Sequence, residues 1–513
     1  MNSEERDDVK VARDATSLFV MNIITASSSV LYFSVAARIL PSPVELGILA
    51  FITILGMLLN TFGTFALPQA AIRFLADLRG KKSIAGGRAF FKRIIIAATF
   101  CSMGSALFLV ILSNPLASLF LSDASNAIFI VSLAFDIIPL IMKNFFHRSL
   151  IGQGRVKKAG TAGAIGGISR ATFAMIFLLQ GYGILGIIFG WAIGDSLDAA
   201  LCFYWASQGY LSDGESRVTN KALMEYIGPL YLSNILNYLN STLDRYVLLL
   251  FIGSASLGFY TPVLTVIGLV SYLPMSVSSA LFPKFSQMFS GSGKDRTRRA
   301  ADIAIRWLYI IFLPITFGIA LESYYVLLLI AGGVYTSSAP FLSLLVIIYG
   351  ISSPSVVYVS ILMAHARTQR LFYVKAVVLL SGIVTAILLV NSLQIWGVVI
   401  ARSIMILAEF GLSGLLLWSL NEVNFAGRFI VKPLLASVSA IVVLFLFQNI
   451  WSQLFILPIY AILGLLVYLF SLRLLRGIRS SDLDFLRDFL PGKLSKIIDI
   501  FEVILISGKS KED

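Results

Sequence analysis

Apolar runs of about twenty residues recur along almost the whole chain, and each is long enough to cross a bilayer as a helix. Backbone groups in hydrocarbon must be hydrogen-bonded internally, so such runs fold as helices. The sequence therefore predicts an all-α, polytopic membrane protein with about fourteen spans. Their approximate bounds are 15–40, 46–73, 89–113, 124–147, 158–180, 184–208, 222–252, 256–283, 300–321, 338–364, 370–391, 396–420, 430–450 and 454–474.

The composition supports this class. Of 513 residues, 58% are hydrophobic and 13% are charged, which is too apolar for a soluble protein of this length. The N-terminal sequence MNSEERDDVKVARD is acidic and has no small-residue cleavage site, so it does not predict a cleaved signal peptide. Cys101 and Cys202 lie in apolar runs, and His147 and His365 are far apart in sequence. This pattern predicts neither a disulfide framework nor a metal site.

The stretch Leu223–Gly253 is long enough to span the membrane, yet it carries polar side chains at helical spacing. An unpaired amide or charge in hydrocarbon costs several kcal/mol, so this face must contact protein or water. We interpret it as part of the wall of a solvated central cavity. The alternative is that the same groups hydrogen-bond between packed helices. The candidate substrate-binding residues in this stretch are Asn234, Asn237, Tyr238, Ser241 and Arg245.

Basic residues are concentrated in alternate loops, which predicts the orientation of the chain in the membrane. One set of loops contains Arg79, Lys81, Lys82, Arg88, Lys92 and Arg93, then Arg155, Lys157 and Lys158, then Lys294, Arg296, Arg298 and Arg299, then Arg367 and Arg370. The intervening loops contain neither Lys nor Arg. We therefore expect both termini to be cytoplasmic. The formal net charge of +13 is read as a topological signal rather than as a nucleic-acid site.

The two halves of the chain resemble each other at an offset of 211 or 212 residues. The matching pairs are Leu46-Gly47 with Leu257-Gly258, Gln153-Gly154-Arg155 with His365-Ala366-Arg367, Leu185-Gly186 with Trp396-Gly397, and Asp198 with Glu409. We predict two six-helix lobes, 1–210 and 211–421, with the same orientation and related by an axis along the membrane normal. Residues 422–476 would add two further membrane helices. Residues 477–513 would form an amphipathic segment on the cytoplasmic surface.

Charged residues inside the predicted spans form a second group of candidates. Such residues either pair with each other or face water, and they mark substrate or ion paths. Pairing of Arg170 with Asp195 or Asp198 is one interpretation, and contact with a ligand or ion is the other. The residues in this group are Asp136, Arg170, Asp195, Asp198, Arg402 and Glu409.

Polar residues at the ends and along the faces of other spans extend the candidate cavity. Asn22 and Thr25 lie on a polar stripe of the first span, while Arg73 and Lys284 lie at the basic ends of the second and eighth spans. Arginine binds phosphate in a bidentate fork, so a cleft lined by such residues would attract an anionic headgroup. The alternative for Arg73 and Lys284 is that they only fix the topology.

No enzyme signature is present. The sequence contains no G-x-S-x-G motif, no phosphate-binding loop of Walker type and no Cys/His metal-binding spacing. No loop is large enough to hold a catalytic domain. We therefore expect a transport protein rather than an enzyme, with no cofactor.

Three segments resemble polysaccharide-export flippases. They are RILPSPVELGILAF followed by ALPQAAIRF, the segment DRYVLLLFIGSASLGFYTPVLTVIGLVSYLPMSVSSALFPKFSQMF, and QGRVKKAG followed by GYGILGIIFGWAIG. This family belongs to the superfamily that also contains multidrug extruders and lipid II flippases. The resemblance covers about the first twelve spans. The acidic cation site expected near the start of a drug extruder is reduced to Asp14.

The resemblance implies two six-helix lobes with alternating access and the flipping of an isoprenoid-(pyro)phosphate-linked oligosaccharide. The implied partners are this lipid-linked glycan and membrane lipid, without nucleic acid. The protein would act as a monomer in the cell membrane, with glycan-assembly enzymes as further candidate partners. The alternatives are an ion-coupled exporter of small organic cations and a membrane glycosyltransferase, which would need an external catalytic carboxylate.

Overall fold

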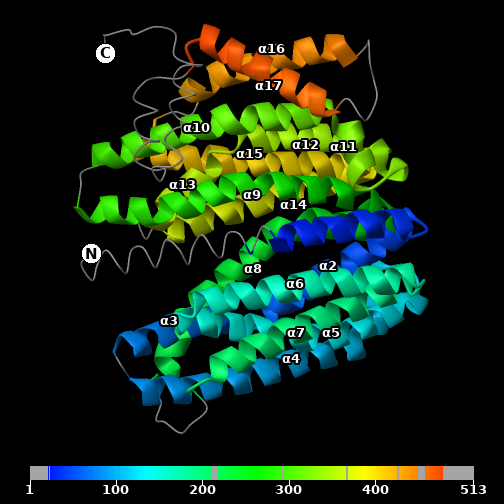
Figure 1. Cartoon of the computed structure of the whole chain (residues 1–513), viewed down its shortest axis with the longest axis vertical. Coiled ribbons are helices and arrows are strands. Elements are labelled where there is room, and N and C mark those ends of the chain that lie inside the picture. Colours follow the sequence, from blue (N-terminus) through cyan, green and yellow to red (C-terminus); the bar gives the residue numbers. More distant parts are fainter. Residues whose placement is uncertain are drawn as a thin grey trace. The chain divides into compact units, whose positions relative to one another are not determined.

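The computed structural model describes residues 21, 24–81, 83–210, 218–291, 294–364, 368–424, 427–448 and 457–477. These residues are almost entirely helical, and none of them forms a strand (Figure 1). After a helix over Ile24–Ile39, the α-helices are α2 (Pro43–Phe62), α3 (Leu67–Gly80), α4 (Ile84–Phe120), α5 (Ala127–Gly152), α6 (Val156–Leu179), α7 (Gly183–Ser207), α8 (Asn220–Phe251), α9 (Ser254–Gly291), α10 (Lys294–Leu321), α11 (Ser323–Ile330), α12 (Ala339–Ile351), α13 (Ser355–Ala364), α14 (Thr368–Leu393), α15 (Ile395–Ser419), α16 (Gly427–Gln448) and α17 (Leu457–Leu474).

Among the described residues, 11 helices are long and apolar enough to cross a membrane. The protein is therefore a multi-pass helical membrane protein, as the apolar runs predicted. The helix over Ile24–Ile39 and α17 are shorter than this criterion, and α8 is absent from the set. The count of fourteen spans stays a prediction.

The chain forms two compact units. The first comprises residues 1–262 with 329–334 and 390–395, and the second comprises the remainder of the chain. The division into two six-helix lobes, two further helices and a tail stays a prediction, and residues 478–513 of that tail lie outside the described residues.

In the first unit, α7 packs along both α5 and α6. Small residues allow this close approach. A β-carbon at Gly190 would overlap with the backbone of Ala174, and one at Gly194 would overlap with the backbone of Arg170. Both glycines lie on α7 one turn apart, so they bring α6 into backbone contact over that turn. This contact places the side chains of α6 and α7 close enough to form ion pairs across the interface.

The second predicted span is divided into α2 and α3. Phe65 and Ala66 have positive φ angles of 51° and 57°, a left-handed conformation that costs an L-residue about 1–2 kcal/mol. Pro68 follows in the first turn of α3, where a missing backbone N–H is tolerated. The hydroxyl of Tyr231 on α8 donates to the carbonyl of Phe62 at 3.1 Å, so it satisfies one acceptor freed by the break.

The helices α2 and α9 meet through a reciprocal glycine contact. A β-carbon at Gly47 would overlap with the carbonyl oxygen of Ser254, and one at Gly258 would overlap with the carbonyl oxygen of Pro43. These residues occupy equivalent positions at the internal offset of 211. Each helix therefore makes the same contact with the other, as in a two-fold symmetric interface.

A second pair of equivalent glycines makes the same contact in each unit. Gly186 on α7 lies against Phe177 at the end of α6, and Gly397 on α15 lies against Leu389 near the end of α14. In both cases an added β-carbon would overlap with the preceding helix. Glycines at equivalent positions of the two halves thus pack against the end of the preceding helix.

The core of the second unit surrounds α10. Tyr309, Leu313 and Tyr358 are fully buried there, and α10 packs against α12 and α16. The helices α16 and α17 lie side by side (Figure 1, orange). Tyr468 on α17 is buried, and its hydroxyl donates to the carbonyl of Ile310 at 2.7 Å. This bond attaches the last described helix to α10.

Candidate functional site

The polar face predicted on α8 is present, and its side chains differ in exposure. Thr219 caps the helix by accepting from the backbone N–H of Ala222 at 3.3 Å. Asn237 and Ser241 are exposed, and Asn234 is partly exposed. Neither Asn234 nor Asn237 uses its side chain in a hydrogen bond with any described residue. These amides are therefore available to a ligand or to water.

Arg245 lies on the same helix, and no described residue accepts a hydrogen bond from its guanidinium. Its Nε atom is buried, and the side chain as a whole is only partly exposed. The neighbouring acid, Asp244, instead accepts from the hydroxyl of Tyr260 at 3.0 Å. A partly buried cation without a counter-ion is costly, so it indicates a place for an anion or for ordered water.

Arg73 on α3 lies near the other end of α8. Its guanidinium stacks on the ring of Tyr226, with 4.3 Å between Cζ and the ring centroid. The side chain is exposed and makes no ion pair with a described residue. The stacking fixes the direction of the side chain and leaves its hydrogen-bond donors free.

Tyr238 has a different environment from its polar neighbours on α8. It is buried, and its hydroxyl donates to the carbonyl of Ile54 on α2 at 2.9 Å. The same hydroxyl lies 2.6 Å from that of Tyr246. Of the five candidates on α8, Tyr238 is thus used in packing against α2.

The candidates at the start of the chain and on α9 are only partly described. Thr25 is partly buried, its hydroxyl donates to the carbonyl of Met21 at 3.0 Å, and its methyl group lies against Gly167 on α6. Asn22 lies outside the described residues, as does the side chain of Lys284. Their assignment to a cavity stays a prediction.

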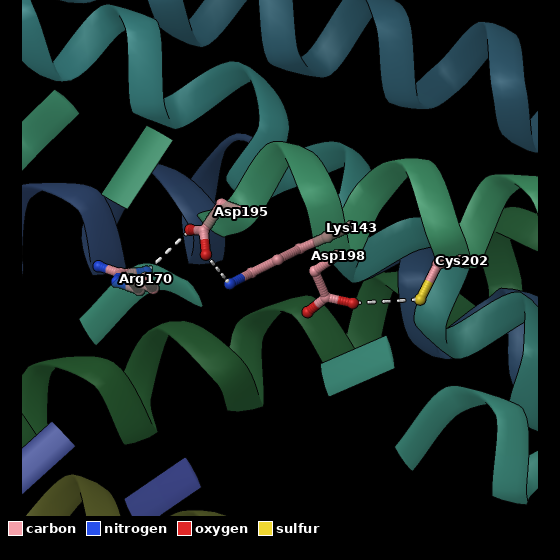
Figure 2. A network of polar contacts seen from close by, with 5 residues as sticks. All are labelled: Lys143, Arg170, Asp195, Asp198 and Cys202. Atoms are coloured by element: carbon pink, nitrogen blue, oxygen red, sulfur yellow. Dashed lines mark hydrogen bonds and ion pairs between the residues drawn. The ribbon is translucent and has the colours of Figure 1, made fainter. Parts of the chain in front are cut away.

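A buried charge cluster lies between α5, α6 and α7 (Figure 2). Asp195 on α7 is 1% exposed and accepts from two cations. Its Oδ1 lies 2.6 Å from Nζ of Lys143 on α5, and its Oδ2 lies 2.8 Å from Nη1 of Arg170 on α6. The guanidinium of Arg170 also stacks on Trp191 at 4.5 Å from the ring centroid. The charges that the sequence placed inside spans are therefore paired here.

Two further carboxyl groups border this cluster. Asp136 on α5 is 1% exposed, and its Oδ1 has no hydrogen-bond partner among the described residues. It interacts electrostatically with Asp195, Arg170 and Lys143. Asp198, one turn after Asp195, accepts from the thiol of Cys202 at 3.3 Å (Figure 2). Three acids thus share two cations in a buried region.

The second unit also contains partly buried polar pairs between helices. Glu409 on α15 accepts from Nζ of Lys375 on α14 at 3.1 Å. Arg402, two turns earlier on α15, donates to the hydroxyl of Tyr349 on α12 at 3.1 Å. Both α15 candidates therefore contact neighbouring helices within the second unit.

Sequence analysis missed the two lysines that complete these ion pairs. Lys143 falls seven residues after Asp136 in one predicted span, which places both on one helix face. This spacing in the sequence could have identified Lys143 as a member of the charge cluster. Lys375 lies inside the span predicted over 370–391, and only the fold brings it next to Glu409.

Comparisons with known proteins identify a sequence family and structures of similar fold. A sequence model of the polysaccharide biosynthesis protein family matches residues 11–289. No curated protein sequence matches the chain. The fold resembles that of the lipid II flippase MurJ in an inward closed conformation, with a TM-score of 0.70, 17% identity, and coverage of 88% of this chain and 97% of that structure.

Two more distant structures share the fold. A multidrug resistance MATE family transporter in an inward-facing conformation has a TM-score of 0.61 at 14% identity, covering 79% of this chain and 99% of the other. A transporter of the MOP superfamily from Pyrococcus furiosus, described as having a binding pocket of reversed polarity, has a TM-score of 0.57 at 15% identity, covering 80% and 96%. At these identities the likeness concerns the fold.

The family match covers more than half of the chain, and the fold is the one that MurJ and the MATE transporters share. This chain belongs to the polysaccharide biosynthesis protein family and has the MurJ- and MATE-like transporter fold.

Proposed function

We propose that the protein is a flippase that moves a lipid-linked oligosaccharide across the cell membrane by alternating access. The lipid carrier would be an isoprenoid phosphate or pyrophosphate. The observation that carries this proposal is Arg245, a partly buried cation on α8 for which no described residue supplies a counter-ion. A phosphate group would supply the missing charge and accept several of its hydrogen bonds.

The length of α8 matches the distance that a headgroup must travel. Tyr226, which holds Arg73, and Arg245 are separated by 19 residues, or about 28 Å along a helix, close to the thickness of the hydrocarbon core. Asn234, Asn237 and Ser241 lie between these two arginines. The proposed path starts at Arg73, at the predicted cytoplasmic end, and continues along the amides to Arg245, with the lipid tail in the bilayer.

The proposal also assigns the remaining candidates. Thr25, Asn22 and Lys284 would extend the polar wall, and the polar pairs of α7 and α15 with neighbouring helices would stabilise the helices that carry it. The protein would act as a monomer, with both termini cytoplasmic. Glycan-assembly enzymes that deliver the substrate are proposed partners.

The alternative is export of small organic cations, which the fold of the multidrug transporters supports. Two carboxylates that would serve such a substrate are already paired. Asp195 holds two cations, and Glu409 holds Lys375. The free charge on the α8 face is positive, which favours an anionic substrate over a cationic one.

The experiment uses purified protein in liposomes that contain a fluorescent lipid-linked oligosaccharide, and follows its protection from an external quencher. A hydrogen bond to a charged group contributes about 1.5–3 kcal/mol, so Arg245→Ala should slow flipping by roughly tenfold to a hundredfold. Arg245→Lys should retain part of the rate because it keeps the charge.

Lys81→Ala is the matched control. Lys81 is 69% exposed, and its ion pair among the described residues is with Asp77 four residues earlier. Its loss changes the net charge equally and should leave flipping unchanged. Equal rates for Arg245→Ala and the control, at equal amounts of folded protein, would contradict the proposed role. Transport of organic cations without any flipping of the labelled lipid would support the alternative.

A further inference from the structure

Three side chains with metal-binding atoms converge between α5 and α7. They are His147 on α5 and, on α7, Asp198 and Cys202. One imidazole nitrogen, one carboxylate oxygen and the thiol sulfur all lie within 4.8 Å of one another. Asp198 and Cys202 are buried, and His147 is partly buried. Figure 2 shows Asp198 and Cys202 on the same face of α7, joined by their contact.

The spacing of these atoms fits a single tetrahedral ion. With bonds of about 2.0–2.3 Å, two ligands of one zinc ion are separated by about 3.3–3.7 Å. The Sγ of Cys202 and Oδ1 of Asp198 are already 3.3 Å apart. Four residues separate Asp198 from Cys202, so both point from one face of the helix toward α5 without any change in the backbone. The imidazole of His147 would need to move by about 1 Å, within the reach of a side-chain rotation.

The donor atoms are available. Neither ring nitrogen of His147 hydrogen-bonds to any described residue. Its neighbour on α6 is Gly163, where a β-carbon would lie 3.4 Å from the ring. The hydrogen bond from the thiol of Cys202 to Asp198 would be replaced when the thiolate binds the ion. His147 and Cys202 each lie five residues before the end of their helix, about 7.5 Å along the axis from the end that we predict to be cytoplasmic.

The charge balance of the region points independently to a cation. Asp198 interacts with Lys143 and Asp195, so it belongs to the same electrostatic unit as the buried cluster. That unit contains three carboxyl groups and the two cations Lys143 and Arg170. The imidazole of His147 interacts with Arg148 and Lys143, and the groups that act on Asp198 are Lys143, Cys202 and Asp195. With all carboxyls ionised, the unit carries one uncompensated negative charge in an apolar region.

We propose that His147, Asp198 and Cys202 bind one divalent ion of the zinc class, and that this ion links α5 to α7 near the predicted cytoplasmic side. The ligand set of nitrogen, oxygen and sulfur is the set that zinc prefers. Binding brings two positive charges and releases the thiol proton of Cys202 to solvent. A dication with one carboxylate, one thiolate and a neutral imidazole is electrically neutral, and it leaves Asp136 and Asp195 balanced by Lys143 and Arg170. The fourth position remains for water.

The chain supplies its own controls, because it contains two histidines and two cysteines. Purified full-length protein would be stripped of metal in detergent and titrated with Co²⁺, which gives a thiolate-to-cobalt absorption band when sulfur is a ligand. Zn²⁺ would then be added to displace it. We expect one ion per chain in the unmodified protein, in Cys101→Ser and in His365→Ala. We expect loss of the band in Cys202→Ser, and affinity at least tenfold lower in His147→Ala and Asp198→Asn.

A second measurement needs no variant. A ligand that binds only the folded state stabilises it by about 2.7 kcal/mol at one hundred times its dissociation constant, so Zn²⁺ should raise the unfolding temperature of the unmodified protein. Mg²⁺, which binds sulfur ligands poorly, should not raise the unfolding temperature.

Absence of the cobalt band in the unmodified protein, or an equal loss of binding in Cys101→Ser, would overturn the proposal. Failure here would leave the flippase proposal intact, because the two tests share neither substrate nor readout. If no ion binds, a proton kept by one of the three buried carboxyls (Asp136, Asp195 or Asp198) would balance the charge of the cluster.

Discussion

Gly47 on α2 and Gly258 on α9 make the same contact from opposite sides of one interface. A β-carbon on either glycine would overlap with a backbone carbonyl of the other helix, Ser254 in one direction and Pro43 in the other. The four residues are two pairs of repeat equivalents. The contact between α2 and α9 is therefore reciprocal, with each glycine against a backbone carbonyl of the other helix.

The glycine contact predicts a severe effect of a single methyl group. Gly47→Ala or Gly258→Ala should destabilise the protein by about 1–3 kcal/mol or more, because a backbone carbonyl must move to make room. Gly268→Ala on the same helix α9 is the control, since nothing lies within 4 Å of its added β-carbon. Thermal unfolding in detergent, followed by fluorescence-detected size exclusion, measures the difference. Equal unfolding temperatures for all three variants would contradict the close contact.

The buried carboxylate of Asp195 predicts a second effect on stability. Asp195→Asn leaves Lys143 and Arg170 without their shared counter-ion, which should cost about 3–5 kcal/mol. Asp77→Asn, which breaks the exposed pair with Lys81, should have little effect. The same unfolding measurement applies. Should Asp195→Asn unfold at the temperature of Asp77→Asn, the cluster would not be an important source of stability.

The pair Lys375–Glu409 is suited to a double-mutant cycle. Lys375→Met and Glu409→Gln should each destabilise the second unit because each breaks the ion pair between these two partly buried side chains. The loss of unfolding free energy in the double variant should be smaller than the sum of the losses in the two single variants. The difference, which is the coupling energy of the pair, should be about 0.5–3 kcal/mol. Strict additivity would show that the 3.1 Å contact contributes nothing to stability.

Tyr238 and Asn237 are adjacent on α8 but should respond oppositely to substitution. Tyr238→Phe removes the hydrogen bonds to Ile54 and Tyr246, so it should lower stability by about 1 kcal/mol and leave flipping nearly unchanged. Asn237→Ala removes an exposed amide of the proposed path, so it should slow flipping without lowering stability. The liposome assay and the unfolding assay on both variants test this. The reverse pattern would place the substrate path on the other side of α8.

The sequence predicted the class of fold because apolar runs are a property of single segments. The internal repeat, in which Gly47 and Gly258 lie within matching short motifs, led to the two six-helix lobes, and these stay a prediction. The sequence did not predict the break at Phe65 and Ala66. Neither residue favours a left-handed backbone, and the nearby Pro68 was the only local indication.

The sequence groups the candidate residues of one helix, but it does not show which helices pack against each other. Helical spacing identifies which residues of α8 share a face, but not which of them contact α2, so Tyr238 was grouped with Asn237. Ion pairs such as Lys143–Asp195 join residues 52 positions apart, and their existence depends on how helices pack. The convergence of His147 with Cys202 is of the same kind, because the two residues lie on separate helices.

The two phenols of α8 that bind α2 also limit how these helices can move. Tyr231 and Tyr238 donate to the carbonyls of Phe62 and Ile54, which lie about two turns apart on both helices. Sliding one helix past the other would break both bonds and leave the two phenol hydroxyls without these acceptors. These two bonds resist sliding between α2 and α8, so we expect the two helices to move together wherever the chain changes conformation.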